Sequence, residues 1–383
     1  MKNRFLILLS FVLIVGRDVV CANTSMVRER ININRDWRYQ IDDPDGVGAA
    51  LHYSRLKPYL LPCANDFIIF GKRYQRPEGN PGENIAYVKS DFDDSEWRHL
   101  NLPHDWAIEG PFNIDYNGST GKLPYWGIRW YRKTLELSQD DAGKQIYLDI
   151  DGAMSYVSVW CNGQYVGGWP YGYASFRLDL TPYIKAGQKN VLAIRLDNPD
   201  DTSRWYPGSG IYRNVWLVKT SPVHVEQWGT FVRNQQVDSE IAVMEMGVNI
   251  ENHAGKDVQV KLQTSVYLQG KDGRPVGEEV TQSMTKDIAI KKDSWSSARF
   301  QFKVDKPKLW DIDTPNCYVA VSRVFMDGKE MDSYETPFGI RTIEFTHNQG
   351  FMLNGQKVAI KGVCMHHDLG ALGAAFNEVA GEG

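Results

Sequence analysis

Cysteine is scarce in this chain, and its few copies are widely spaced. Five cysteines occur among 383 residues, and one of them, Cys21, falls close to the N-terminus. The others, Cys63, Cys161, Cys317 and Cys364, match neither a compact disulfide scaffold nor a Cys-x-x-Cys metal site. We therefore expect free thiols, most of them buried. Disulfides are the alternative if the compartment is oxidising.

Long apolar runs are missing except at the N-terminus. Residues 5–15 are apolar and follow a basic start, and small residues follow at Cys21-Ala22. This pattern predicts a secretory signal peptide over residues 1–22, because the apolar stretch is too short to span a bilayer. A lipid on Cys21 is the alternative, which Val20 disfavours as a residue before a lipidated cysteine. We expect an exported protein, periplasmic or extracellular, without a transmembrane segment.

A large excess of charge of either sign is absent as well. Without residues 1–22 the chain has 40 basic and 46 acidic side chains, a net charge of −6. This balance is unlike the basic surface of proteins that bind nucleic acid, so no nucleic-acid partner is expected. Internal repeats and low-complexity tracts are missing too, and a chain of this length predicts two or three ordinary domains.

Helical periodicity is nearly absent, and short alternating runs between turn signals take its place. Such a pattern is typical of β-sandwiches. Tyr131, Lys133 and Leu135 are predicted to share one face of a strand, because side chains alternate across a sheet. Asn162-Gly163 lies between two such runs and predicts a hairpin, since both turn positions favour a positive φ.

A turn at residues 220–222 separates two units, predicted over 23–220 and 221–338. The stretch 66–83, rich in Gly, Pro and Arg, predicts the least regular part of the first unit. The second unit has the size of an immunoglobulin-like sandwich. Its expected strands are 223–232, 241–250, 258–268, 298–304 and 318–325.

Residues 339–383 form a third unit that is predicted to be incomplete. Short strands are expected at 340–345, 351–353 and 358–363, with a turn at Asn354-Gly355 between the last two. No amphipathic helix follows, and so short a unit cannot bury a stable core of its own.

Short motifs rich in aromatic residues and glycine follow one another along the chain. They are Leu102-Pro103-His104-Asp105-Trp106, Trp130-Tyr131-Arg132, Asp151-Gly152-Ala153, Val159-Trp160-Cys161-Asn162-Gly163, Arg204-Trp205-Tyr206-Pro207-Gly208-Ser209-Gly210-Ile211-Tyr212-Arg213, Pro307-Lys308-Leu309-Trp310, Phe338-Gly339-Ile340-Arg341, Leu353-Asn354-Gly355 and Lys361-Gly362-Val363. Together and in this order they resemble family 2 glycoside hydrolases, the β-galactosidase and β-glucuronidase group, over residues 30–370.

The resemblance implies a mainly β fold in three parts. These are a jelly-roll-like sandwich over 23–220, an immunoglobulin-like sandwich over 221–338, and the first strands of an incomplete (β/α)8 barrel over 339–383. It also implies hydrolysis of terminal β-glycosides with retention, with β-galactosides as the expected substrates and without a cofactor. The resemblance leaves the oligomeric state undecided between a monomer and a homo-oligomer.

The resemblance also implies that the catalytic groups are missing, since both are glutamates on later barrel strands in this family. Glu378 follows no such strand and is not expected to be catalytic, so the chain alone is expected to be inactive. One alternative is a non-catalytic carbohydrate-binding or scaffolding β-sandwich module, because fold does not determine function. Another is a truncated or frameshifted product that folds poorly.

Two residues are predicted to bind substrate by the same resemblance. His366 would follow the first barrel strand, where active-site residues of such barrels lie, and its imidazole can donate to or accept from a hydroxyl. Asp105 would reach from the first sandwich into the sugar pocket, with a turn or cap as the structural alternative. Trp205 and Tyr206 are expected to pack between sandwich and barrel, with a sugar-binding platform as the alternative.

No metal is expected. His366, His367 and Asp368 have the right chemistry, but neighbours on an extended chain point in opposite directions. Some β-galactosidases of the family have an ion-binding aspartate after the central hairpin. This sequence has tyrosine at the matching place in Gly168–Tyr173.

Overall fold

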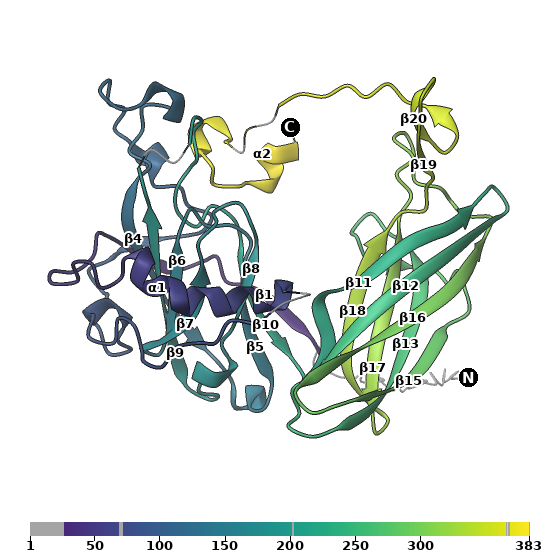
Figure 1. The fold of residues 1–383 in the computed structure, drawn as a ribbon, viewed down its shortest axis with the longest axis horizontal. Helices are drawn as coiled ribbons and strands as arrows, with labels where there is room; N and C mark the ends of the chain where they lie inside the picture. The colour runs from purple at the N-terminus through teal and green to yellow at the C-terminus, as the bar shows by residue number, and fades with distance from the viewer. Residues whose placement is uncertain (1–26, 69–71, 201–202, 365, 367, 383) are drawn as a thin grey trace, which may run out of the picture.

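The computed structural model describes residues 27–68, 72–200, 203–364, 366 and 368–382. Strands dominate the fold, as predicted, and form two bodies that lie side by side in Figure 1. We call the purple-to-teal body the N-terminal sandwich and the green body the second sandwich. A yellow C-terminal segment crosses back to the N-terminal sandwich. The predicted signal peptide, with Cys21, lies outside the described residues.

The N-terminal sandwich consists of two antiparallel sheets. One has the strand order β1-β10-β5-β8 and the other the order β3-β2-β4-β9-β6-β7. The strands are β1 (Glu29–Asn32), β2 (Trp37–Ile41), β3 (Arg98–Leu100), β4 (Gly127–Glu136), β5 (Gln145–Ile150), β6 (Val157–Cys161), β7 (Gln164–Trp169), β8 (Phe176–Asp179), β9 (Lys189–Asn198) and β10 (Val215–Thr220). Alternate side chains of both sheets meet in one apolar core, which includes Trp37, Tyr131, Leu148, Ile194 and Leu217.

The predicted alternation in β4 is confirmed, but the strand is covered on both faces. Tyr131 and Leu135 are buried in the core between the sheets. Lys133 follows the same alternation, is half-buried, and donates from Nζ to the Arg35 carbonyl at 2.6 Å. On the opposite face Trp130 and Arg132 are buried too, because a second layer packs there.

That second layer is residues 43–97, which include the helix α1 (Tyr53–Leu60). Its apolar side chains pack on Trp130 and Trp160, whose rings are stacked with centroids 5.4 Å apart. The Trp160 indole donates to the Pro81 carbonyl at 2.7 Å, so both the apolar and the polar parts of this side chain are satisfied. The sequence pattern gave no sign of this layer.

Short turns connect the strands where Asn-Gly pairs predicted them. Asn162 and Gly163 have φ of 51° and 80° and join β6 to β7, as expected. The irregular stretch 66–83 contributes to this hairpin through Asn80. Its side chain accepts from the Tyr165 amide at 2.7 Å and donates to the Gly163 carbonyl at 2.9 Å.

The second sandwich contains all five predicted strands and three more. One sheet has the order β11-β12-β16, and the other the order β14-β13-β17-β18 with β15 also paired to β13. The predicted strands are β11 (Val223–Val237), β12 (Ile241–Asn252), β13 (Val258–Gln269), β16 (Ser294–Asp305) and β17 (Tyr318–Met326). The additional ones are β14 (Pro275–Val276), β15 (Met284–Ile290) and β18 (Lys329–Phe338).

The third unit matches its prediction only in part. A small sheet contains β19 (Ile343–Thr346), β20 (Gly350–Leu353) and β21 (Gln356–Lys357), with the expected turn at Asn354-Gly355. The predicted strand over 358–363 is wrong, since this run is extended but unassigned to any strand, with Ile360 and Val363 exposed. A strand needs a neighbour for its backbone groups, and within the described chain only the first residue has one here: the Val358 amide donates to the Phe351 carbonyl of β20 at 3.0 Å, while residues 359–363 join no strand.

Ion pairs join the two sandwiches. Arg28, just before β1, donates to both carboxylate oxygens of Asp332 on β18 at 2.9 and 2.8 Å. No disulfide joins any of the cysteines in the described parts of the chain. The prediction that most of them are buried is wrong, since only Cys161 is buried, Cys63 and Cys317 are half-buried, and Cys364 is exposed. Within the same ranges, no helix has the length and apolarity needed to cross a bilayer.

Candidate functional site

Asp105 lies in a loop that the backbone holds tightly to the N-terminal sandwich. The loop connects β3 to a short 3-10 helix, η3 (Ala107–Glu109). The Leu102 amide donates to the Asn34 carbonyl at 2.8 Å, and the His104 amide donates to the Ile211 carbonyl at 2.9 Å. These bonds fix the chain on both sides of Pro103 and turn the Asp105 side chain inward.

The Asp105 carboxylate is buried, at 2% exposure, and receives three hydrogen bonds. Oδ1 accepts from the Ala107 amide at 3.0 Å. Oδ2 accepts from the Tyr206 hydroxyl at 2.5 Å and from the Ala374 amide at 2.8 Å. Burial raises the pKa of Asp105 above its usual range, and the three donors oppose that shift. Burial and the adjacent carboxylate together raise the pKa of the Tyr206 phenol.

The C-terminal segment 369–376 closes over Asp105. Gly373 has a φ of 58°, and a side chain there would place its Cβ 2.4 Å from Asp105 Oδ2. The Phe376 amide donates to the Tyr212 carbonyl at 2.9 Å, and Ala374 is buried against Met154 and Tyr212. Figure 1 shows this yellow segment resting on the N-terminal sandwich, with α2 (Glu378–Glu382) at its end.

His366 is exposed and lies three residues before this docked segment. The structure therefore brings its part of the chain to the region of Asp105. Asp368 is close enough to add to the raised pKa of Tyr206, after burial and Asp105. His367, the third member of the metal hypothesis for this stretch, lies outside the described residues. The predicted sugar contacts of Asp105 and His366 stay predictions.

The neighbours of Asp105 in sequence have structural contacts. His104 is buried, with Nδ1 2.8 Å from the Tyr131 hydroxyl and Nε2 3.2 Å from Glu109 Oε1. Arg98 binds Glu109 through two contacts of 2.6 Å. The hydrogen bond from His104, reinforced by Arg98, lowers the pKa of Glu109 to about 2. Glu109 is therefore a fixed anion beside the loop rather than a proton donor.

Exposed aromatic side chains stand near the site. Trp205 is 41% exposed, and its indole donates to the Tyr173 hydroxyl at 2.9 Å. Tyr171 is 60% exposed, with its ring centroid 5.7 Å from that of Tyr173. Tyr206, by contrast, packs partly buried against the core. The sequence analysis considered tyrosine in Gly168–Tyr173 only at the place of an ion-binding aspartate and did not single out Ala374, because only the folded chain brings these residues near Asp105.

Metal-ligating residue types come together at a different place, where the two sandwiches meet. His224, Glu251 and His253 each offer one ligand atom, and these atoms lie within 4.8 Å of one another. Burial lowers the pKa of His224 while the Glu251 carboxylate opposes that shift, and the same carboxylate raises the pKa of His253. Spacing alone could not identify the group, since His224 is on β11 and His253 follows the end of the neighbouring strand β12.

The comparisons with known families match two consecutive stretches of the chain. Residues 87–221 match the model described as glycosyl hydrolases family 2, sugar binding domain. Residues 223–341 match the model described as glycosyl hydrolases family 2. Together these stretches make up more than half of the chain, and they follow one another without overlap.

Curated relatives are similar over most of this chain. The β-galactosidase BoGH2A of Bacteroides ovatus is 42% identical over 362 residues, which cover 93% of this chain and 37% of that protein. A putative β-glucuronidase of Formosa agariphila is 34% identical over 323 residues, covering 81% of this chain and 30% of that protein. The chain thus spans about a third of the length of these relatives.

Solved structures agree with these relatives. A glycosyl hydrolase family 2 member from Bacteroides cellulosilyticus superposes with a TM-score of 0.77 at 30% identity, covering 92% of this chain and 40% of that one. A β-glycosidase from Bacteroides vulgatus gives a TM-score of 0.70 at 32% identity, covering 91% of this chain and 38% of that one. Both family models match in order, and the curated relatives and the solved structures agree with them. The chain therefore belongs to glycosyl hydrolase family 2.

Proposed function

We propose that this chain is the sugar-facing, non-catalytic part of a retaining exo-β-glycosidase that acts on β-galactosides. The observation that carries the proposal is the similarity to the Bacteroides ovatus β-galactosidase, at 42% identity over 93% of this chain. The two family-model matches support the same assignment. The Formosa agariphila relative makes β-glucuronides the competing substrate class.

Retention requires two carboxylates about 5–5.5 Å apart across the scissile bond. One attacks the anomeric carbon, and the other protonates the leaving oxygen and then activates water. The acidic groups around the described site are unsuited to these roles. Asp105 is enclosed by three hydrogen bonds, Glu109 is bound by Arg98 and His104, and Glu378 is exposed at the start of α2. We therefore propose that the catalytic pair belongs to a continuation of the barrel beyond residue 383.

His366 and Asp105 are the proposed sugar contacts in that enzyme. His366 is exposed and can offer a ring nitrogen to a hydroxyl. An ionised carboxylate has about four acceptor positions, and three of those on Asp105 are filled. In this arrangement Asp105 acts first by holding segment 369–376, and a direct sugar contact requires Gly373-Ala374 to move away.

The second candidate function is carbohydrate binding without catalysis. The observation that favours it is the group of exposed aromatic rings, Tyr171, Tyr173 and Trp205, beside the Asp105 region. Aromatic faces of this kind combine an apolar surface with polar edges, which suits a sugar ring.

One experiment separates the two functions. The 383-residue chain and the product of the continued reading frame are each assayed on 4-nitrophenyl β-D-galactoside and β-D-glucuronide. We expect no turnover by the shorter chain and hydrolysis of the galactoside by the longer one. Turnover by the shorter chain would refute the proposed position of the catalytic pair. Galactoside binding by the shorter chain in calorimetry, lost in Trp205→Ala, together with an inactive longer product would establish the binding module instead.

A further inference from the structure

His224 and Glu251 are placed opposite one another by the first strand pairing of the second sandwich. In the antiparallel register of β11 and β12, His224 is the direct partner of Glu251. His253 lies two residues after Glu251, and its amide donates to the Pro222 carbonyl at 2.8 Å, so the chain stays alongside β11. Residues directly opposite share a face, and His253, the first residue after β12 (Ile241–Asn252), is held beside that face by the same backbone bond. The three side chains therefore converge from one face of this ribbon.

The distances from the Glu251 carboxylate to both histidines suit a small divalent cation, and all three ligand atoms lie within 4.8 Å of one another. His224 Nε2 is 3.3 Å from Glu251 Oε2, and His253 Nε2 is 3.6 Å from the same oxygen. A tetrahedral zinc site with bonds of about 2.0–2.1 Å has ligand atoms about 3.3–3.4 Å apart. Both measured distances lie within a few tenths of an ångström of that value. His253 is 40% exposed in its side chain and has room to adjust.

The surroundings of His224 direct a lone pair toward Glu251. Nδ1 is 2.9 Å from the Ser221 carbonyl, which can only accept, so Nδ1 carries a proton, and in the neutral ring Nε2 is the lone-pair atom that faces Glu251. A second ring nitrogen held by a backbone carbonyl is the usual arrangement around a metal-binding histidine. Two lone-pair atoms 3.3 Å apart repel one another unless a positive charge lies between them, and His224 is fully buried.

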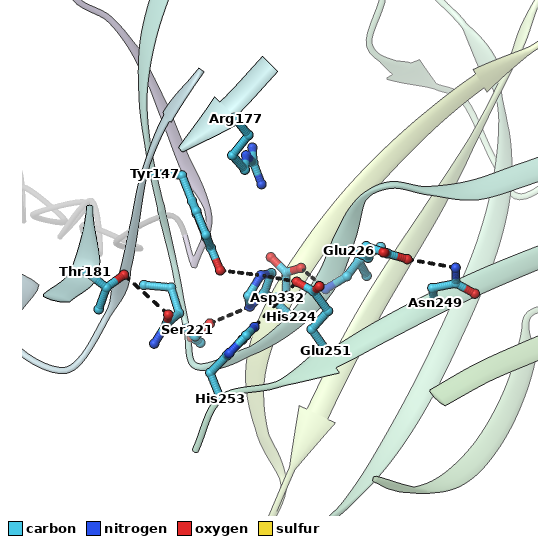
Figure 2. Close-up of polar contacts among 12 residues, drawn as sticks. Tyr147, Arg177, Thr181, Ser221, His224, Glu226, Asn249, Glu251, His253 and Asp332 are labelled. Carbon is cyan, nitrogen blue, oxygen red and sulfur yellow. Dashed lines mark hydrogen bonds and ion pairs between the residues drawn. The ribbon is translucent and has the colours of Figure 1, made fainter. Parts of the chain in front are cut away.

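The neighbouring arginines are already paired with other carboxylates, so neither of them neutralises Glu251. Arg28 is engaged by Asp332, and Arg177 donates to both oxygens of Asp149 at 2.6 and 2.8 Å. Figure 2 shows both histidine rings directed at Glu251, with Tyr147 reaching toward them from the N-terminal sandwich. The Tyr147 hydroxyl lies 3.4 Å from His224 Nε2, a long contact for a hydrogen bond.

A cleft of about 440 Å³ opens beside the group, and Glu251 and His253 are among its lining residues. It offers a route for an ion and space for a water molecule as a further ligand. Two imidazoles, one carboxylate and one water form a ligand set that zinc accepts. Calcium prefers six to eight oxygen ligands, so this set disfavours it.

We propose that His224, Glu251 and His253 bind one Zn²⁺ ion at the junction of the two sandwiches, with water from the cleft as the fourth ligand. The ion would tie the connecting residues 221–224 to the end of β12. It would thereby stiffen the junction, and it has no part in the proposed hydrolysis.

The test is zinc binding by the whole chain after treatment with a chelator. Equilibrium dialysis and calorimetry with ZnCl₂ measure stoichiometry and affinity, and CaCl₂ serves as the comparison ion. We expect one zinc per chain, no calcium at the same concentration, and a rise in Tm with zinc. Cobalt substitution should give the intense visible absorption of a four-coordinate site.

Variants locate the ion. Glu251→Gln and His253→Gln should each weaken zinc binding at least 10-fold, while thermal unfolding without metal shows that they fold. His99→Gln is the matched control, since His99 is exposed and lies 3.8 Å from Asp36, so its loss should leave binding unchanged. Tyr147→Phe should bind zinc as tightly as the parent chain. The proposal is overturned if the parent chain binds no zinc, or if His253→Gln binds it as well as His99→Gln.

Discussion

Replacing Gly373 by alanine tests whether its close approach to Asp105 holds the C-terminal segment in place. The substitution puts a methyl group 2.4 Å from Asp105 Oδ2, at a residue whose φ is 58°. The left-handed α region costs alanine about 1–2 kcal/mol relative to glycine, and Gly373, with ψ of −138°, lies outside that region, where the strain on alanine is larger. The clash also breaks the hydrogen bond from the Ala374 amide to a buried carboxylate, which contributes about 1.5–3 kcal/mol.

Gly370→Ala supplies the matched control, because Gly370 has a φ of 59° and open space around its Cα. Both variants place alanine at a positive φ, and only Gly373→Ala also meets Asp105. The difference of about 1.5–3 kcal/mol corresponds to roughly 10- to 100-fold more frequent opening of the segment.

Amide hydrogen exchange of Ala374 and Phe376 measures that opening directly. Protection at both amides should fall 10- to 100-fold further in Gly373→Ala than in Gly370→Ala, while the strands of the N-terminal sandwich keep theirs. Equal protection in the two variants would refute the argument that contact with Asp105 holds the segment.

Three further perturbations probe the packing around this site and the junction. Tyr206→Phe removes the 2.5 Å hydrogen bond to Asp105 and should lower the free energy of unfolding in urea by about 1.5–3 kcal/mol; an unchanged unfolding midpoint would contradict this. Glu109→Gln should destabilise the chain at neutral pH. The folded-state pKa of Glu109 is about 2, below its usual 4.5. The loss of stability in Glu109→Gln, measured as Tm, should therefore be constant above pH 4.5 and shrink as the pH falls toward 2. A loss of stability that grows in acid would contradict this prediction. Asp332→Ala leaves Arg28 unpaired and should cost about 3–5 kcal/mol in urea unfolding, whereas Glu330→Ala, whose exposed partner Arg323 is 4.0 Å away, should cost less than about 1 kcal/mol.

Local features of the fold could be predicted, since their causes are local. The Asn162-Gly163 and Asn354-Gly355 turns follow from two residues that tolerate positive φ. All five predicted strands of the second sandwich exist because alternating side chains indicate a sheet face directly. The helix α1 was missed because it is a single short helix that buries only Leu56 and Leu60 and contains Pro58.

The site depends on contacts between residues that lie far apart in the sequence, which spacing along the chain cannot predict. The Asp105 carboxylate and the Ala374 amide meet across 269 positions, and the Tyr206 hydroxyl arrives from a third segment. Asp105 and His366 were identified only because their motifs resemble those of a family. The strand predicted over 358–363 fails for the opposite reason, since an apolar run becomes a strand only where another strand pairs with it.

The pairing of β1 with β10 determines when the N-terminal sandwich can be completed during synthesis. Glu29 on β1 pairs with Lys219 on β10, so β1 cannot pair in this sheet until β10 has been synthesised. At about 5–20 residues per second a ribosome needs roughly 10–45 s to reach residue 220, and the exit tunnel delays its release further. From the synthesis of β5 until that of β10, about 70 residues and roughly 4–14 s later at that rate, the edge of β5 that β10 covers is open to other strands. During that time the nascent chain carries an unpaired strand edge that could pair with another chain.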